Sequence, residues 1–328
     1  MNQSVDPEIR RAGVRARFPD ISRYLAHYKV VVDDEEARRQ LQRYAREGQF
    51  EIEVRLPGGI ERRAYTCFDA QLGLTHVAVA CRWRATHAGL RGRPGWRADS
   101  LRAAGYEYWA VQARFAFQAR MLDKHRSGQW GQYDPLLQLQ SIGTHVGGLL
   151  ALGWLDWAAD SARKVRHWIG QGGFYDGGDE YGRRRTQHFV LRLAASWQGW
   201  PELPGPQCAF DEPLFDALIE HWRSPDLALI EQLLLAACDR HTHQARVDQG
   251  SKGVWFDLAL GDRDYDPFEV LAVMRLREQA GLANPTIDHP LMDTPLGKLL
   301  ESTPAYDDEL LAAVVSRMRP ELGGYWVD

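Results

Sequence analysis

The feature that most constrains the fold is a succession of amphipathic helical segments that begins at Asp99 and continues almost to the end of the chain. Between Asp99 and His125 large apolar side chains recur every seven residues, which is typical of one face of a helix. Short stretches of Gly, Pro and Asp separate the further helical segments that we predict, which cover residues 134–149, 152–170, 183–198, 212–222, 225–246, 267–280 and 306–318. Short connections favour antiparallel neighbours, so we expect a mainly α fold of stacked antiparallel helical hairpins.

The residues before this helical region have a different pattern. Residues 21–30 and 33–47 predict helices, and then Phe50–Leu56 alternates between apolar and polar side chains. Turn residues follow, and residues 60–67 predict a returning strand, so we expect a small β-hairpin over residues 50–67. Residues 72–85 fit a strand or a helix equally well. The expected domains are therefore an N-terminal α+β part, 1–95, and a helical domain, 96–328, with an acidic C-terminal portion.

Charge is unevenly distributed along the chain although the net charge is only -4. Residues 1–200 carry 30 Lys and Arg against 21 Asp and Glu, whereas residues 201–328 carry 10 against 23. This division predicts an electrostatic face toward a partner, and the alternative is attraction between the two halves of one chain. Arginines in the basic half are dispersed among acids instead of forming one stripe, so we do not expect a nucleic-acid partner.

Cysteine usage and hydropathy indicate a cytoplasmic protein. The four cysteines lie far apart without a CxxC motif, and no apolar segment follows the first charged residues. The longest weakly polar stretch, Val146–Leu155, is about half the length that a membrane span needs, so we expect no membrane association.

Motifs for cofactors and metals do not emerge from the sequence. Neither a GxxxxGK[ST] motif nor a GxGxxG motif after a strand occurs, and no serine or cysteine nucleophile motif is present. Cys238, His241 and His243 form the densest group of soft ligands, but only the first two lie on the same side of a helix. We therefore expect no metal and no cofactor.

The segment Gly172–Arg185 is the most enzyme-like part of the chain. It places Asp176, Asp179 and Glu180 among glycines, and paired carboxylates in a cleft can act as acid and base in glycoside hydrolysis. The alternative interpretation is a plain helix start, because acids before the first turn suit the helix dipole.

A second acidic segment runs from Trp255 to Glu269. Its acids at positions 262, 264 and 266 have the spacing of a calcium loop, but Pro267 and Val273 stand where that loop needs Gly and Glu. We therefore expect an exposed loop that either caps the following helix or binds a basic partner through aromatic anchors among acids. The residues expected to contact a partner are Trp255, Asp257, Asp262, Asp264, Tyr265, Asp266 and Glu269, together with the three acids of the earlier segment.

The segments Asp211–Asp226 and Pro267–Lys298 carry a resemblance. The second reads PFEVLAVMRLREQAGLANPTIDHPLMDTPLGK and resembles the C-terminal region of helical bacterial immunity proteins that are encoded beside toxins of type VI secretion. More distantly the chain is similar to the immunity proteins of the PoNe toxins. The resemblance implies a protein without enzymatic activity that binds one cognate toxin and blocks its active site. The β-hairpin departs from the all-helical pattern of this family.

These observations predict a cytoplasmic immunity protein for a toxin that we expect to be a nuclease. Nucleases have basic clefts, so an acidic surface would both steer association and cover the path of the substrate. One alternative is a helical toroid-type hydrolase that uses Asp176, Asp179 or Glu180. Another is an adaptor or chaperone for a secreted effector.

Overall fold

The computed structural model describes residues 9, 11–28, 33–131, 133–174, 184–201, 203, 212–248, 254–259 and 261–326. They form a mainly α protein whose described strands make one small antiparallel sheet, as predicted. The chain divides into two compact units: unit 1 contains residues 1–29, 86–94 and 138–304, and unit 2 contains residues 30–85, 95–137 and 305–328. The predicted boundary after residue 95 does not coincide with this division, because each unit combines segments from both ends of the chain.

Unit 2 combines the hairpin with helices from three parts of the sequence. Helix α12 contacts both α2 and α4. The elements are α2 (Glu35–Glu47), β1 (Phe50–Leu56), β2 (Gly59–Tyr65), most of α3 (Cys67–Leu90), α4 (Trp96–Arg126), α12 (Glu309–Leu322) and the short 3-10 helix η4 (Gly323–Tyr325).

The predicted hairpin is confirmed. Strands β1 and β2 pair antiparallel from Phe50 opposite Tyr65 to Leu56 opposite Gly59. The following segment is a helix, which settles the ambiguity over residues 72–85. The reason lies in one half of a capping box: the backbone N–H and the hydroxyl of Thr66 both donate to Asp69 Oδ2, at 2.8 and 2.9 Å. This pair ends the strand and starts α3.

Helix α4 contributes a face of small and aromatic side chains to the core of unit 2. The buried residues Ala103, Tyr106, Ala110, Ala113 and Phe117 follow the three- and four-residue spacing of a helix face. They pack with buried side chains of α2, α3 and α12, and the aromatic rings of Phe50 and Tyr65 stack with centroids 4.7 Å apart. The core of unit 2 is therefore largely apolar.

A close approach at Gly105 joins α4 to the segment before α12. A Cβ atom at Gly105 would lie 2.9 Å from the backbone oxygen of Tyr306, so a side chain at this position does not fit. Nearby, the hydroxyls of Tyr106 and Tyr306 donate to Asp308, and Asp308 also accepts from Leu311 N as the cap of α12. This polar contact positions the last helix of the chain.

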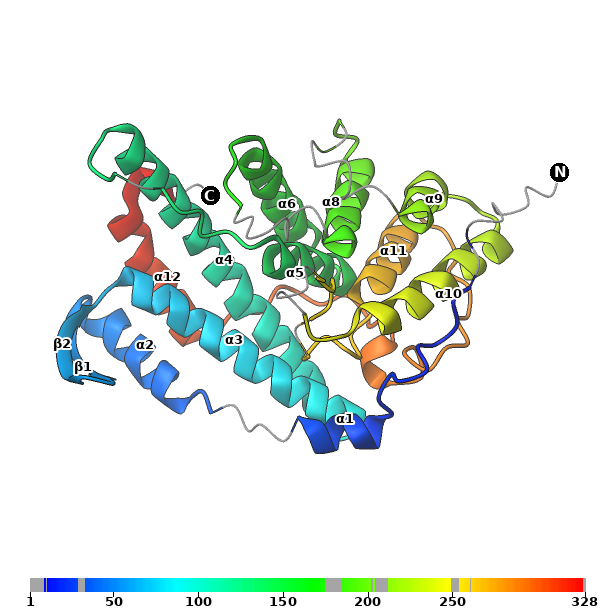
Figure 1. Ribbon diagram of the computed structural model, residues 1–328, viewed down its shortest axis with the longest axis horizontal. Helices are drawn as coiled ribbons and strands as arrows, with labels where there is room; N and C mark the ends of the chain where they lie inside the picture. Colours follow the sequence, from blue (N-terminus) through cyan, green and yellow to red (C-terminus); the bar gives the residue numbers. More distant parts are fainter. Residues whose placement is uncertain are drawn as a thin grey trace. The chain divides into compact units, whose positions relative to one another are not determined.

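Unit 1 is a set of helices around α5. Helix α5 contacts α6, α8 and α11, and α9 contacts α8 and α10 (Figure 1). The elements are α1 (Ile21–His27), α5 (Leu139–Leu152), α6 (Leu155–Gly170), α8 (Arg185–Gln198), α9 (Pro213–His221), α10 (Leu227–Gln244), α11 (Phe268–Gln279) and the 3-10 helix η3 (Pro295–Gly297).

Two glycines on α5 allow this close packing. A Cβ atom at Gly143 would lie 2.5 Å from Gln187 Cβ on α8, and one at Gly147 would overlap the ring of Phe268 on α11. Small residues of α5 therefore let α8 and α11 approach its backbone. The helices within the described part of the chain are too short or too polar to cross a membrane.

Candidate functional site

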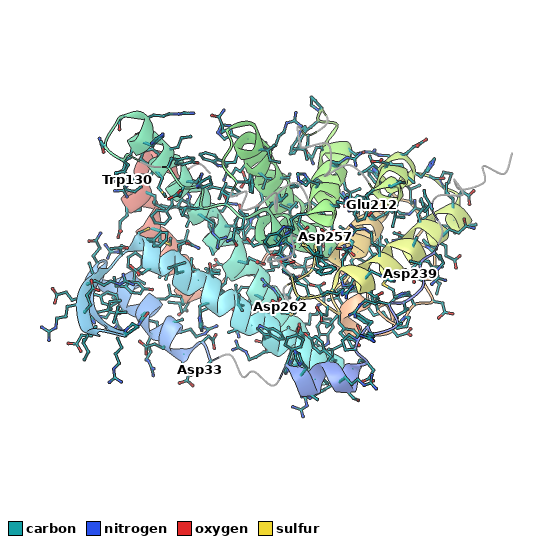
Figure 2. The ribbon with its side chains drawn as sticks, in the orientation of Figure 1. Asp33, Trp130, Glu212, Asp239, Asp257 and Asp262 are labelled. Carbon is teal, nitrogen blue, oxygen red and sulfur yellow. The ribbon has the colours of Figure 1, made fainter. Side chains whose placement is uncertain are left out.

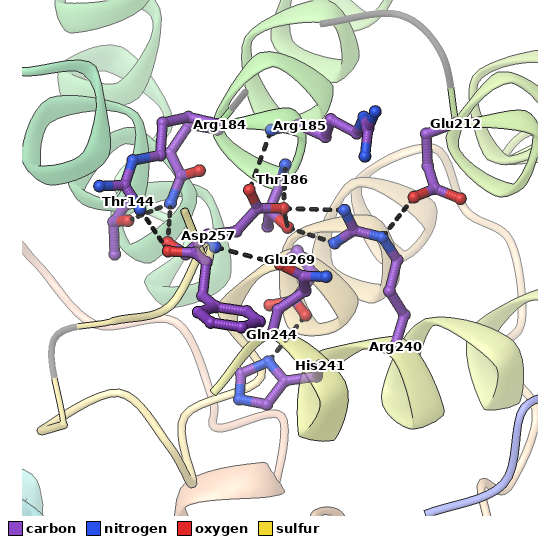
Figure 3. Close-up of polar contacts among 12 residues, drawn as sticks. Thr144, Arg184, Arg185, Thr186, Glu212, Arg240, His241, Gln244, Asp257 and Glu269 are labelled. Atoms are coloured by element: carbon purple, nitrogen blue, oxygen red, sulfur yellow. Dashed lines mark hydrogen bonds and ion pairs between the residues drawn. The ribbon is translucent and has the colours of Figure 1, made fainter. Parts of the chain in front are cut away.

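The predicted partner-binding acids lead to a buried polar cluster at the start of α8 (Figure 3). Asp257, on the segment before α11, has an exposed fraction of only 1%. Its Oδ1 accepts from Arg185 N at 3.1 Å, and its Oδ2 accepts from the N–H and the hydroxyl of Thr186 at 3.0 and 2.7 Å. Helix α8 has no side-chain cap of its own. Asp257 therefore caps a helix that begins more than 70 residues earlier.

Arg240 on α10 neutralises this carboxylate. Its Nη2 donates to Asp257 Oδ2 at 2.8 Å, its Nε donates to Glu212 Oε2 at 2.7 Å, and its Nη1 donates to the Thr186 hydroxyl at 2.7 Å. Burial alone would lower the pKa of Arg240, but the charges of Asp257 and Glu212 raise it above the ordinary value. One guanidinium thus joins α10, the N-terminus of α9 and the cap of α8.

Further hydrogen bonds fix the backbone of the capping segment. Arg184 forms an ion pair with Asp248 at 2.9 Å and also donates to the carbonyl of Phe256. The side-chain amide of Gln187 donates to Asp257 O at 2.7 Å and to the hydroxyl of Thr144 at 3.1 Å. These contacts hold the carboxylate of Asp257 in one position.

A second buried pair links α10 to α11. His241 Nδ1 lies 2.8 Å from Glu269 Oε1, and His241 Nε2 lies 3.1 Å from the carbonyl oxygens of Arg263 and Asp264. Burial lowers the pKa of His241, but the neighbouring Glu269 carboxylate outweighs it, so the pKa is raised. The arrangement suits an imidazolium that donates in both directions.

A third group attaches the N-terminal segment to α10. Asp239 is fully buried and accepts from Arg11 Nε at 3.1 Å and from Gly13 N at 2.9 Å. His289 Nε2 lies 3.4 Å from the same carboxylate, and His289 Nδ1 accepts from Leu291 N, so the ring is neutral with its proton on Nε2. Burial lowers the pKa of His289, which agrees with the neutral form.

The expected exposed acidic loop is corrected by these contacts. Asp262, Asp264, Tyr265 and Glu269 are all at least 94% buried, as is Asp257 (Figure 2 labels Asp257 and Asp262). Charged side chains enter the interior only where other groups pair with them, and here α8, α10 and the N-terminal segment supply most of those groups. These five side chains therefore offer little surface to a protein partner in this fold.

The remaining predicted site residues have different outcomes. Trp255 and Asp266 are partly exposed, and Asp266 forms an ion pair with Arg263. Pro267 precedes α11 as its cap residue. Asp176, Asp179 and Glu180 lie outside the described residues. Within the described residues, no group of three or more His, Cys, Asp and Glu side chains has the geometry of a metal site.

The charge division along the sequence does not separate the two units. Unit 1 carries 23 Lys and Arg against 26 Asp and Glu, and unit 2 carries 17 against 18. The acids of residues 201–328 are thus combined with basic residues from the N-terminal half, such as Arg11 and Arg184. The expected acidic C-terminal portion is not a separate structural region.

Sequence reasoning missed the basic partners in these clusters. One signal was available: α8 begins after Arg184 with no local Ser, Thr, Asp or Asn to cap it, which indicates a cap from elsewhere. Another was the pair Asp239 and Arg240, which interrupts the apolar sequence of α10 and predicts paired charges at a buried position.

The arrangement in unit 1 can hold helices in fixed positions, and the carboxylates of Asp239, Asp257 and Glu269 are occupied by structural partners. Comparison with known proteins finds no matching family model, no matching curated protein and no matching solved structure.

Proposed function

We propose that this chain is an immunity protein that binds and neutralises a cognate secreted toxin. The observation that carries the proposal is the position of the residues on which the resemblance rests. In the segment 267–298, Phe268, Arg277, His289 and Gly297 are buried, and each one fastens part of unit 1. If the resemblance rests on buried residues, it reflects a common scaffold. The exposed surface of that scaffold can then differ from one immunity protein to another and fit one toxin.

Arg277 illustrates this role. Its side chain is fully buried, and its guanidinium donates to the carbonyls of Trp222 at 2.7 Å, Ser224 at 2.8 Å and Ala283 at 2.6 Å. It therefore ties the turn between α9 and α10 to the end of α11. No lysine could satisfy three carbonyls with the same planar geometry. The resemblance thus lies in packing and not in reactive groups.

The proposed contact surface is an apolar patch on α3, which we define as Phe68 and Leu72. The two side chains are one helical turn apart, and 40% and 47% of their surfaces are exposed. Phe68 also makes an edge-to-face contact with Phe117, with ring centroids 5.3 Å apart, so its position is fixed before binding. Fixed aromatic side chains are frequent hot spots of protein interfaces.

The nuclease class of the toxin rests on the resemblance alone. The acids that pointed to a basic partner are paired within the chain, as Asp257 is with Arg240 and Glu269 with His241. The proposed patch is apolar, so it does not require a basic or an acidic surface on the toxin. Suppression of the toxin distinguishes this proposal from an adaptor or chaperone, which would bind an effector without inhibiting it.

The experiment expresses the toxin encoded beside this chain in a bacterial host, with and without the chain. We expect the chain to restore growth and to co-purify with the toxin. The double variant Phe68→Asp, Leu72→Asp should lose protection, with binding weaker by about 1,000-fold or more, because two hot-spot side chains contribute about 2 kcal/mol or more each.

The matched control is Leu227→Asp, a leucine that is 42% exposed at the start of α10 in unit 1. It should protect as well as the unchanged chain. Growth arrest despite intact binding would instead support the adaptor role, and full protection by the double variant would remove the patch from the interface.

A further inference from the structure

Unit 1 contains a pocket of about 310 Å³ between the N-terminal segment, α1 and the end of α10. This volume is at the lower end of the range for small-molecule sites, which is about 300 to 1,000 Å³. Its lining combines basic side chains, aromatic rings and one acid, namely Arg15, Arg17, His27, Arg246, Tyr24, Tyr28 and Asp264. Every lining residue belongs to unit 1.

Within the described residues, the three arginines of this pocket form no ion pair with an acid at bonding distance, although the charge of Asp264 acts on Arg15. Arg15 donates only to neutral carbonyls, those of Thr242 at 2.6 Å, Arg17 at 2.8 Å and Ala245 at 3.2 Å. Burial lowers the pKa of Arg15, and the charge of Arg246 lowers it further. Three guanidinium groups around one pocket therefore favour an anionic occupant.

Asp264 is the second observation that points to a ligand. Its side chain is 94% buried, and its carboxylate oxygens accept no hydrogen bond from the described residues. Burial raises the pKa of this carboxyl group to about 7; the His241 charge opposes the shift, Asp262 adds to it, and Arg15 opposes it. Burial raises the pKa values of the Tyr24 and Tyr28 phenols, and the nearby charge of Asp264 raises them further.

The geometry points to a binding site for a small phosphate ester, in which Arg15, Arg17 and Arg246 hold the phosphate and Asp264 donates a hydrogen bond to it. A phosphate oxygen accepts from guanidinium N–H groups and from a protonated carboxyl group, so all four side chains gain partners. The rings of Tyr24, His27 and Tyr28 line the space for the organic part of the ester. This inference concerns unit 1 and does not depend on the apolar patch of unit 2.

Proton uptake follows from this arrangement. An ionised Asp264 repels the phosphate, whereas the protonated form donates to it, so binding strengthens as the pH falls through 7. The test uses sulfate, whose charge is constant over this range, and measures its affinity by calorimetry on the full chain. Between pH 8 and pH 6 the protonated fraction of Asp264 rises from about one tenth to about nine tenths, which predicts affinity about tenfold higher at pH 6.

Substitutions test which residues cause the sulfate binding and its pH dependence. Asp264→Asn should remove the pH dependence, and Arg17→Glu or Arg246→Glu should weaken sulfate binding about tenfold or more. Both arginines are exposed, so these changes leave folding intact. The matched control is Arg23→Glu on α1, whose side chain is 82% exposed and outside the lining. Equal sulfate affinities of Arg17→Glu, Arg246→Glu, Arg23→Glu and the unchanged chain would overturn the inference.

Adenosine monophosphate and glucose 6-phosphate then test the organic part of the ligand. We expect at least one ester to bind more tightly than sulfate and to be displaced by it. Esters that bind no more tightly than sulfate would overturn the assignment to an ester. Sulfate binding that is the same at pH 6 and pH 8 would overturn the role of Asp264.

Discussion

The two units bury different kinds of side chains. Unit 2 packs an apolar and aromatic core, and its buried carboxylates, Asp34 and Asp69, pair with arginines that remain partly exposed. Unit 1 instead buries ion pairs at the junctions of its helices, where both partners are withdrawn from solvent, as in Asp257 with Arg240 and Glu269 with His241.

Because of this difference, the two units specify their structures through different interactions. A buried ion pair gains little net free energy, because desolvation of the two charges offsets their attraction. However, each charge needs its partner in one position, so the clusters of unit 1 fix where α8, α10 and α11 meet. The stability of unit 2 depends on close packing of its core, so it is sensitive to the size and shape of the buried side chains.

The strongest test of this comparison removes a charge from unit 1. Asp257→Ala leaves Arg240 with only Glu212 and removes the cap of α8, so we expect unfolding of unit 1 to become easier by about 3 to 5 kcal/mol. Hydrogen exchange of α8 and α10 amides measures this for unit 1 alone. The control is Asp216→Asn, which breaks the Arg192 pair at an aspartate that is 53% exposed and should cost less than about 1 kcal/mol. Equal effects of the two changes would contradict the comparison.

A volume change tests unit 2. Leu74 on α3 is fully buried in its core, and Leu74→Ala should destabilise unit 2 by about 2 to 5 kcal/mol through lost apolar contacts and the cavity left behind. The loss should be the same at pH 5 and pH 8, because no charge is involved. Hydrogen exchange of the α3 and α12 amides measures this loss of stability. A strongly pH-dependent loss would show that ionisable groups stabilise this core.

The smallest expected effect, counted per pH unit, is a pH dependence confined to unit 1. His241 and Asp264 both have raised pKa values, so each contributes stability at low pH that is lost as the pH rises through its folded value. For Asp264 the window runs from about 4 to about 7, and for His241 it begins above about 6.5. The slope is at most about 1.4 kcal/mol per pH unit for each proton.

Variants separate the two contributions. Asp264→Asn should flatten the lower window, and the double variant His241→Gln, Glu269→Gln should flatten the upper one without leaving a buried charge unpaired. Amide exchange between pH 5 and pH 8, corrected for its intrinsic rate, measures both. Stability of unit 1 that rises with pH over this range would reverse the sign and refute the assignment.

Much of the fold could be predicted from local sequence. The hairpin follows from the alternation of Phe50–Leu56 and the glycines after it, and the helices follow from periodicity and their Gly and Pro boundaries. The segment after the hairpin was ambiguous by periodicity alone, yet Thr66 and Asp69 already had the spacing of a capping box. Local hydrogen bonds of this kind are readable because their partners are three residues apart.

The candidate site could not be predicted in the same way. Asp257, Asp264 and Glu269 look like an exposed acidic loop because acids among turn residues are usually solvated. Their burial depends on partners far along the chain: Thr186 lies 71 residues from Asp257, and His241 lies 28 residues from Glu269. The pocket likewise combines Arg15 and Arg246, which nothing in the local sequence connects.

The sequence by itself determined the elements of this protein: a mainly α chain with a hairpin, and helix boundaries at glycines. Local preferences decide these features, since helix and turn hydrogen bonds join near neighbours. Only the tertiary structure decided that the chain forms two interleaved units and that the acids of residues 257–269 are interior groups. The physical reason is that a charge can be buried only when packing brings a distant partner to it.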